Sequence, residues 1–258
     1  MIFNCALVIL YVVGCARLIP QHVFQDRTLF GLSHSRTVRL WEEVGSLIWY
    51  LWNASYMFFT HITFDFFFHS SLTLSASDVH SVEHDRVREL LGCNIAYYVG
   101  MLLVSLWSPR RRDWHEMATH HVITICLMGV AYAVGFYDVS VFVLFINAVA
   151  DIFLSSSRIA YDLDSWLQTP LFAGFVAAHL LLRVGFYPFK VWECFFSSMS
   201  QYHGVLDYLP GLCTVPLWLL YLFWTPKIFG VCWKRVVRGD RDVDKSVRQK
   251  KSSGKKQK

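Results

Sequence analysis

Two adjacent histidines in an apolar stretch, His120 and His121, are the residues best suited to chemistry in this sequence. Residues three or four positions apart stack on one face of a helix, so Asp113, Glu116, His120 and Thr124 are predicted to form one polar stripe. Imidazole can move a proton near neutral pH or attack an acyl carbonyl. The pattern therefore predicts acid–base or nucleophilic catalysis by one of the two imidazoles, with Glu116 orienting His120.

A second polar stripe lies in the next apolar segment. Asn147, Asp151, Ser155 and Arg158 follow one another there at spacings of four, four and three. A carboxylate at membrane depth either has a partner or stays protonated. We predict that Asp151 pairs with the histidines across two antiparallel helices and raises the basicity of the imidazole. A purely structural hydrogen bond between the helices is the alternative.

Other polar residues of the apolar segments each have two interpretations. Arg183, with His179 one turn before it, either supports the site or extends its charge toward the membrane surface. Glu42 and Glu43 serve either the site or the membrane interface. A metal centre is not predicted, because His115 and the histidine pair form one small group and the other histidines are scattered. The seven cysteines are also scattered, with no CxxC, which indicates buried apolar thiols and neither a disulfide framework nor a structural zinc site.

Membrane helices must position these residues. Of the 258 residues, 55% are hydrophobic and 17% are charged, whereas a soluble domain carries about 25% charged residues. The apolar residues fall in long blocks, which excludes a disordered chain and argues against a single soluble core. We predict an all-α, polytopic membrane helix bundle of about seven transmembrane helices, the first of them an uncleaved span. The blocks are 2–19, 42–64, 90–108, 114–136, 139–161, 169–189 and 209–231.

The basic residues predict the orientation of the bundle. With the carboxyl terminus in the cytosol, 20 of the 24 Lys and Arg residues lie on the cytosolic side. The basic tail is predicted to be disordered, and it serves either to attract anionic lipids or as a sorting signal. Lys255 and Lys256 stand fourth and third from the carboxyl end, which matches the dilysine retrieval signal of the endoplasmic reticulum. The sequon at Asn53 lies inside a predicted span, so we do not expect glycosylation.

Four segments of the sequence resemble one known family. RRRDWHEMATHHVIT with the later LSSSRIAY is similar to the signature of the ceramide synthase (longevity-assurance) family, in the TLC-domain superfamily. RLWEEVGSLIWY, LLLRVGFYP and LPGLCTVPLWLLYLFWTPKIF resemble an early span, an Arg…Pro segment and the last span of that family. The likeness covers about 36–238. We therefore divide the chain into an N-terminal transmembrane helix with a cytosolic connector (1–35), a TLC domain (36–238) and a basic cytosolic tail (239–258).

The resemblance implies a six-helix barrel around an acyl tunnel in the endoplasmic reticulum membrane. It also implies a sphingoid base N-acyltransferase, which transfers a fatty acyl group from acyl-CoA to the amine of a sphingoid base and needs no cofactor. Its essential pair corresponds to His120 and His121, and the last aspartate of its signature to Asp151; Asp113 and Thr124 also match. The expected partners are acyl-CoA, the sphingoid base and membrane lipids, with a homodimer or heterodimer compatible with the resemblance and no nucleic acid. The phosphates of CoA are expected at Arg110, Arg111 and Arg112.

The signature departs from the family in its second half. Asn147 and Ala148 stand where the family has His-Asp, so one signature aspartate and a third histidine are missing. Asn147 can donate a hydrogen bond but cannot titrate. It or Thr124 is the expected donor to a developing oxyanion. The departure leaves an alternative function, a non-catalytic TLC-domain protein that binds or senses lipid.

Overall fold

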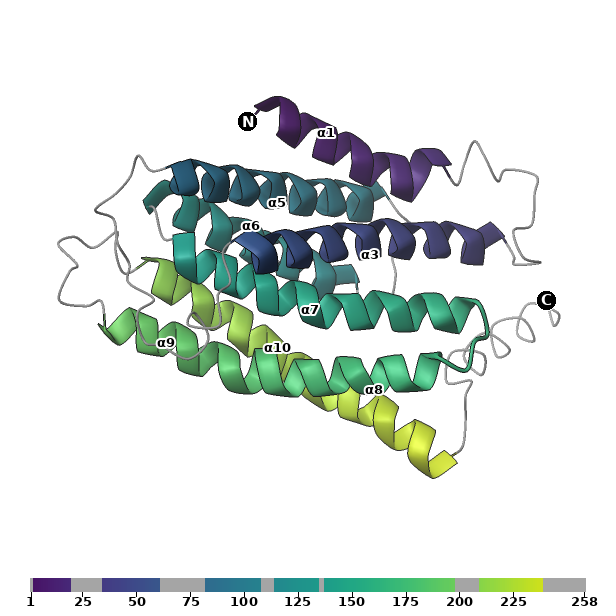
Figure 1. The fold of residues 1–258 in the computed structure, drawn as a ribbon. Helices are drawn as coiled ribbons and strands as arrows, with labels where there is room; N and C mark the ends of the chain where they lie inside the picture. The colour runs from purple at the N-terminus through teal and green to yellow at the C-terminus, as the bar shows by residue number, and fades with distance from the viewer. Residues whose placement is uncertain are drawn as a thin grey trace. The chain divides into compact units, whose positions relative to one another are not determined.

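All regular structure that the computed structural model describes is helical (Figure 1). The described residues are 2–19, 34–60, 82–107, 114–134, 137–197 and 209–238, and the predicted basic tail 239–258 lies outside them. The all-α class is thereby confirmed for the described residues. In chain order the helices, with η marking a π-helical stretch, are α1 (Ile2–Val13), η1 (Gly14–Leu18), α3 (His34–Thr60), α5 (Val82–Trp107), α6 (Trp114–Val134), α7 (Tyr137–Asp162), α8 (Gln168–Ala178), η4 (His179–Phe186), α9 (Tyr187–Ser197) and α10 (Leu209–Arg238).

Five described helical segments are long and apolar enough to cross a membrane, as a polytopic membrane protein requires. They agree with five of the seven predicted spans. The first predicted span differs, because the apolar helix there covers Asn4–Ala16 alone. The second corresponds to α3, which is 27 residues long but begins with a strongly charged stretch. The five segments are Asp85–Trp107, Trp114–Val134, Ser140–Asp162, Gln168–Glu193 and Gly211–Lys234.

Two compact units, Met1–Trp218 and Leu219–Lys258, make up the chain. Residues 209–218 of α10 belong to the first unit and are bonded to the helix before them. The hydroxyl of Tyr187 donates to the carbonyl oxygen of Thr214 (3.1 Å), and the indole N–H of Trp218 donates to that of Val184 (3.3 Å). Every described residue of the predicted site lies in the first unit.

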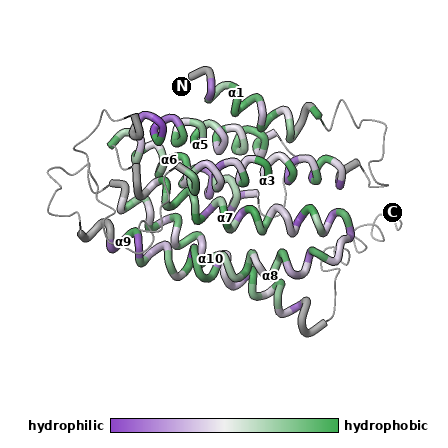
Figure 2. Tube along the Cα trace, viewed as in Figure 1, coloured by the Kyte–Doolittle hydropathy of each residue, from purple (hydrophilic) through white to green (hydrophobic). Residues whose placement is uncertain are grey.

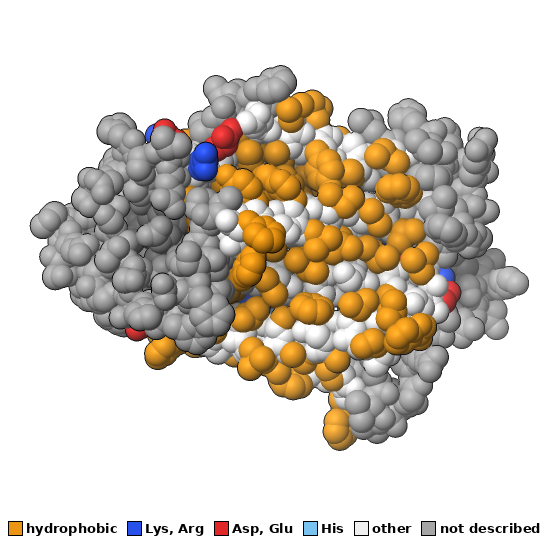
Figure 3. Space-filling model, in the orientation of Figure 1, with side chains coloured by type: hydrophobic (Ala, Val, Ile, Leu, Met, Phe, Trp, Pro, Cys, Tyr) orange, Lys and Arg blue, Asp and Glu red, His pale blue; other side chains and the backbone are white. Residues whose placement is uncertain are grey.

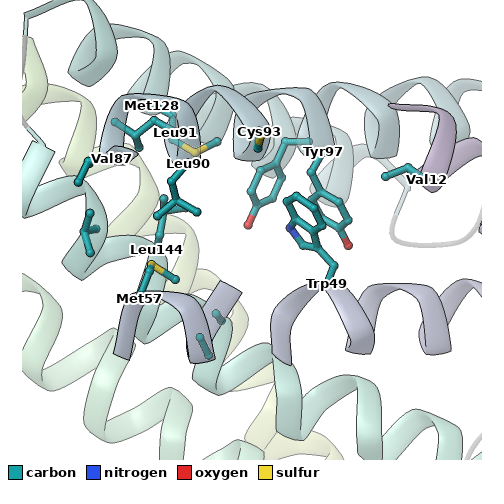
Figure 4. Close-up of a cluster of buried hydrophobic side chains, with 14 of the residues drawn as sticks. Val12, Trp49, Met57, Val87, Leu90, Leu91, Cys93, Tyr97, Met128 and Leu144 are labelled. Atoms are coloured by element: carbon teal, nitrogen blue, oxygen red, sulfur yellow. The ribbon is translucent and has the colours of Figure 1, made fainter. Parts of the chain in front are cut away.

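The apolar core of the first unit forms where α1, α3, α5, α6 and α7 meet (Figure 4). Trp49 of α3 stacks on Tyr97 of α5 with ring centroids 4.7 Å apart and planes 4° apart. On the same pair of helices, the side-chain amides of Asn53 and Asn94 exchange two buried hydrogen bonds of 3.1 and 2.9 Å. Because lipid tails are as apolar as leucine, close packing and hydrogen bonds of this kind hold membrane helices together. They fix α3 against α5.

The stretch η1, which directly continues α1, comes close to α3 at Gly45. A Cβ atom added to Gly45 would lie 2.8 Å from Cβ of Cys15, closer than real side chains pack. The hydroxyl of Tyr11 in α1 donates to the carbonyl oxygen of Gly45 (2.7 Å). Small residues allow such close approach of membrane helices, so the glycine is needed for this contact.

α7 lies beside α3 and turns back into α8 at its end (Figure 1). Arg39 of α3 binds Asp162 in the last turn of α7, with 2.7 Å between Nη2 and Oδ1. The helix ends there because Asp164 takes a left-handed φ of 52°, which aspartate tolerates. The N–H of Ser165 then donates to the carbonyl oxygen of Ala160 (2.8 Å) and closes the turn. The reversal carries α8 and η4 back along α7.

The outer surface of the described helices is largely apolar. Figure 2 shows hydrophobic residues in every labelled helix, interspersed with hydrophilic ones. Figure 3 shows their side chains spread over the visible face, with the charged side chains mostly toward the ends of the helices. Large exposed apolar residues include Phe59, Trp107, Leu181 and Phe189. A surface of this kind suits contact with lipid.

Candidate active site

The histidine pair lies on α6, whose start is tied to α5. The indole N–H of Trp114, the first residue of α6, donates to the carbonyl oxygen of Ser105 near the end of α5 (2.8 Å). The two helices then pack along each other. Glu116 lies in the first turn, and His120 and His121 lie further along the helix at buried positions. The tie at Trp114 therefore helps set which face of α6 meets α5.

Both imidazoles lie inside the bundle. His120 is 9% exposed and His121 is 5% exposed. Their ring centroids are 5.6 Å apart, with planes inclined by 49°. The ring of Tyr98, from α5, lies 6.1 Å from that of His120 and 5.8 Å from that of His121. The three rings form one buried cluster, so the pair does not point into lipid.

Asp151 binds Arg183 where the sequence predicted an imidazole partner. Oδ1 of Asp151 lies 2.6 Å from Nη2 of Arg183, and the two side chains are 13% and 4% exposed. The same nitrogen donates to the backbone carbonyl oxygen of Asn147 (3.1 Å). Arg183 belongs to η4, and π-helical stretches often occur at functional sites because they shift side chains away from the regular helical spacing. Asp151 therefore makes a bond between helices, as the structural alternative predicted, and its partner is a guanidinium.

Arg183 also connects this ion pair to the histidines. Its guanidinium lies close enough to His120 for its positive charge to act on that imidazole. The carboxylate of Asp151 in turn lies close enough to Tyr50 in α3 for its charge to act on that hydroxyl. Two imidazoles, a carboxylate and a fixed cation therefore share one buried region built by α6, α7 and η4. Such a set can accept a proton, supply a nitrogen nucleophile and stabilise a developing negative charge.

A family model described as a TLC domain matches residues 38–230, which is most of the chain and contains the whole of this region. The chain belongs to the TLC-domain family.

Curated relatives of this TLC-domain protein include two that are named as ceramide synthases and one that is named as an ASC1-like protein. Ceramide synthase LOH2 of Arabidopsis thaliana is 32% identical over 119 residues, 45% of this chain and 38% of that protein. ASC1-like protein 3 of Oryza sativa subsp. japonica is 28% identical over 151 residues, 56% of this chain and 51% of that protein. Ceramide synthase 5 of Homo sapiens is 26% identical over 161 residues, 58% of this chain and 39% of that protein. The matches span about half of these relatives or less, and they confirm the family resemblance seen in the sequence.

The two expected oxyanion donors of the TLC domain donate hydrogen bonds to backbone carbonyl oxygens of their own helices. The hydroxyl of Thr124 donates to the carbonyl oxygen of His120 (2.8 Å). The amide nitrogen of Asn147 donates to that of Val143 (2.7 Å). A threonine hydroxyl carries a single proton, so Thr124 would have to rotate before it could donate to a substrate.

The stripe on α7 divides between two neighbouring helices. Asp151 turns to η4, whereas Nη1 of Arg158 lies 2.9 Å from Oε1 of Glu43 in α3. Arg158 and Glu43 therefore bind each other, and this ion pair joins α7 to α3. Ser155, which lies between Asp151 and Arg158 along α7, is 3% exposed.

His179 of η4 is fully buried, with its ring 5.9 Å from that of Phe175.

Among the residues that the structure describes, no group of three or more His, Cys, Asp or Glu side chains could hold a metal ion. Six predicted site residues fall outside the described ranges: Arg110, Arg111, Arg112, Asp113, Lys255 and Lys256.

Sequence reasoning missed Tyr98. A tyrosine within an apolar segment resembles an ordinary core residue, so its residue type alone does not mark it as part of a site. The adjacent pair Tyr97-Tyr98 was the available signal. Helical periodicity places the two on different faces, but it does not say which face meets the histidines.

Proposed function

We propose that this multi-pass TLC-domain protein is a sphingoid base N-acyltransferase, a ceramide synthase that uses acyl-CoA. The observation that carries the proposal is the pair of buried, adjacent imidazoles beside the Arg183–Asp151 ion pair. The names of the relatives support the same reaction. Buried ionisable groups within membrane helices are costly and are retained mostly where they function.

In the proposed reaction, the amine nitrogen of the sphingoid base attacks the thioester carbonyl of acyl-CoA. One imidazole takes the amine proton, the C–N bond forms, and the C–S bond breaks. CoA leaves as a thiolate, which takes the proton back from the imidazolium. A two-step route has the same products: an imidazole nitrogen first takes the acyl group and expels the thiolate, and the amine then attacks the acyl-imidazole. Either route needs His120 or His121 as its reacting group.

Arg183 is the proposed stabiliser of the negative charge that develops on the thioester oxygen. A fixed cation in a water-poor region interacts strongly with such charge. Asp151 holds the guanidinium in place and limits the cost of burying it. Asn147 keeps a supporting role, because its backbone carbonyl accepts from Arg183.

The expected surroundings of the reaction follow from the family. We infer that the acyl chain lies among the helices and that the CoA phosphates bind Arg110, Arg111 and Arg112, just before α6. The dilysine Lys255-Lys256 supports residence in the endoplasmic reticulum with a cytosolic carboxyl terminus. Acyl-CoA is then a co-substrate and no cofactor is required. Assembly as a homodimer or heterodimer is compatible with this proposal.

The decisive experiment expresses the chain in cells lacking ceramide synthase activity and assays their microsomes with a panel of acyl-CoAs and a sphingoid base. We expect N-acyl sphingoid base from the wild type and at least a 100-fold loss in His120→Ala or His121→Ala, with protein abundance unchanged. His115→Ala is the matched control, because His115 is exposed on the same helix with its ring against Trp114. Full activity in both single variants would remove the mechanism.

The Asn147-Ala148 departure keeps one alternative in view, a lipid-binding or lipid-sensing protein without catalysis. Ala148 lies in the apolar core, so the missing signature acid has no polar substitute at that position. A wild type that is abundant and correctly inserted, yet forms no product with any acyl-CoA, would favour this alternative.

A further inference from the structure

We propose that Tyr98 is a positioning residue of the site, whose ring sets the orientation of His121. Its catalytic consequence rests on the acyl transfer proposed above, but its effect on the imidazoles can be tested separately. Tyr98 is 6% exposed and projects from α5 into the histidine pair.

The geometry places one ring against both imidazoles. The planes of Tyr98 and His120 are inclined by 79°, an edge-on contact, and those of Tyr98 and His121 by 53°. Aromatic rings attract one another at centroid separations of about 4.5–7 Å. Both contacts fall within this range, so rotation of Tyr98 would alter the surroundings of both histidines.

The orientation of His121 depends on ring contacts. Among the described residues, its side chain contacts the rings of Tyr98 and His120, and its buried Nδ1 has no hydrogen-bond partner. A functional histidine is ordinarily oriented by a hydrogen bond at its second nitrogen. Here the packing of Tyr98 takes over that task.

Tyr98 is itself held by neighbouring rings. Tyr97 meets it edge-on, with centroids 5.5 Å apart and planes at 86°. Tyr97 in turn stacks on Trp49 of α3 (Figure 4). A continuous series of rings therefore runs from α3 through α5 to the histidines on α6, which gives Tyr98 the rigidity that positioning requires.

Removing this ring should disturb the reaction more than the binding of acyl-CoA. We expect Tyr98→Leu to lower kcat at least tenfold, since small misplacements of reacting groups have effects of about this size or larger. The KM for acyl-CoA should change less than about threefold, because the proposed phosphate contacts are untouched. Tyr98→Phe keeps the ring and should restore kcat to within about threefold of the wild type.

The second readout does not need acyl transfer. Diethyl pyrocarbonate modifies accessible imidazole nitrogens, and mass spectrometry of the peptide containing His120 and His121 measures the rate in intact membranes. We expect Tyr98→Leu to raise this rate at least threefold and Tyr98→Phe to leave it unchanged. Phe142→Leu is the matched control: Phe142 is 1% exposed, and its ring meets Phe186 of η4 at 5.6 Å.

The outcomes separate the two proposals. An unchanged modification rate in Tyr98→Leu overturns the positioning role, as does an equal rise in Phe142→Leu, which would indicate general loosening. A rise specific to Tyr98→Leu supports it, and an accompanying fall in kcat extends it to catalysis. A wild type without acyltransferase activity refutes the proposed function, while the modification rates still decide the role of Tyr98.

Discussion

The carboxylate of Asp151 lies 2.6 Å from the guanidinium of Arg183, across the contact between α7 and η4. Arg183 is buried and Asp151 is largely so, and both lie in helical segments that are long and apolar enough to cross a membrane. Each charge alone would be costly at this depth, whereas the pair carries no net charge. The arginine therefore permits a carboxylate to stand near the histidines although one acid of the family signature is missing.

Breaking this pair on one side should destabilise the protein. We expect Arg183→Met to lower the free energy of unfolding by about 3–5 kcal/mol, since it leaves a buried carboxylate without its cation. The double variant Arg183→Met/Asp151→Leu removes both charges and should recover most of that loss. Acyl transfer should be lost in both the single and the double variant. Thermal unfolding in detergent and the microsomal assay measure the two effects, and equal unfolding temperatures for the wild type and Arg183→Met would contradict the buried pair.

Restoring the missing signature acid should not improve the protein. Ala148 is 5% exposed and belongs to the apolar cluster that also contains Leu144 and Met128. A carboxyl group there would be surrounded by hydrocarbon, which costs roughly 2–4 kcal/mol even if it stays protonated. We expect Ala148→Asp to be less stable than the wild type and no more active. Ala148→Ser is the smaller polar control, and a gain in acyl transfer on Ala148→Asp would show that position 148 faces the site.

The histidine pair could be predicted from sequence because two adjacent imidazoles in an apolar helix have few structural explanations. The partner of Asp151 could not be predicted. Sequence spacing assumes 3.6 residues per turn, and η4 departs from that spacing at Arg183 itself. The contact of Tyr98 with the histidines could not be predicted for a different reason. Tyr98 packs against side chains of another helix, and periodicity within one helix does not show which residues of another helix it meets.

The extent of the second span was also hard to read from hydropathy. α3 begins at His34, well before the predicted start at 42. Its early charged residues precede the predicted span, yet Arg39 is part of the helix and binds the buried carboxylate of Asp162. Charged residues at the start of a helix can thus belong to its packed face, which only the partner helix reveals.

The ion pairs that α3 makes with the last residue of α7 and with the turn after it should differ in strength. Arg39 binds Asp162 at 2.7 Å, and the carboxylate is 6% exposed. Arg36 lies 3.6 Å from Asp164, whose side chain is 67% exposed. We expect Arg39→Ala to cost about 3 kcal/mol, because it leaves a buried carboxylate unpaired. Arg36→Ala should cost less than about 1 kcal/mol. Similar unfolding temperatures for the two variants in low salt would show that burial of Asp162 does not matter.

The contact between η1 and α3 should depend on the absence of a side chain at Gly45. A Cβ there would lie 2.8 Å from Cβ of Cys15, and neither atom can rotate away. Gly45→Ala must therefore push the helices apart and strain the bond from Tyr11, at a cost of about 1–3 kcal/mol. Gly129→Ala is the matched control, because a Cβ on Gly129 meets nothing within 4 Å. That change should leave stability unchanged or raise it by up to about 1 kcal/mol. Thermal unfolding of both variants in the same detergent measures the difference. A Gly45→Ala protein as stable as Gly129→Ala would mean that η1 does not pack on α3 at this position.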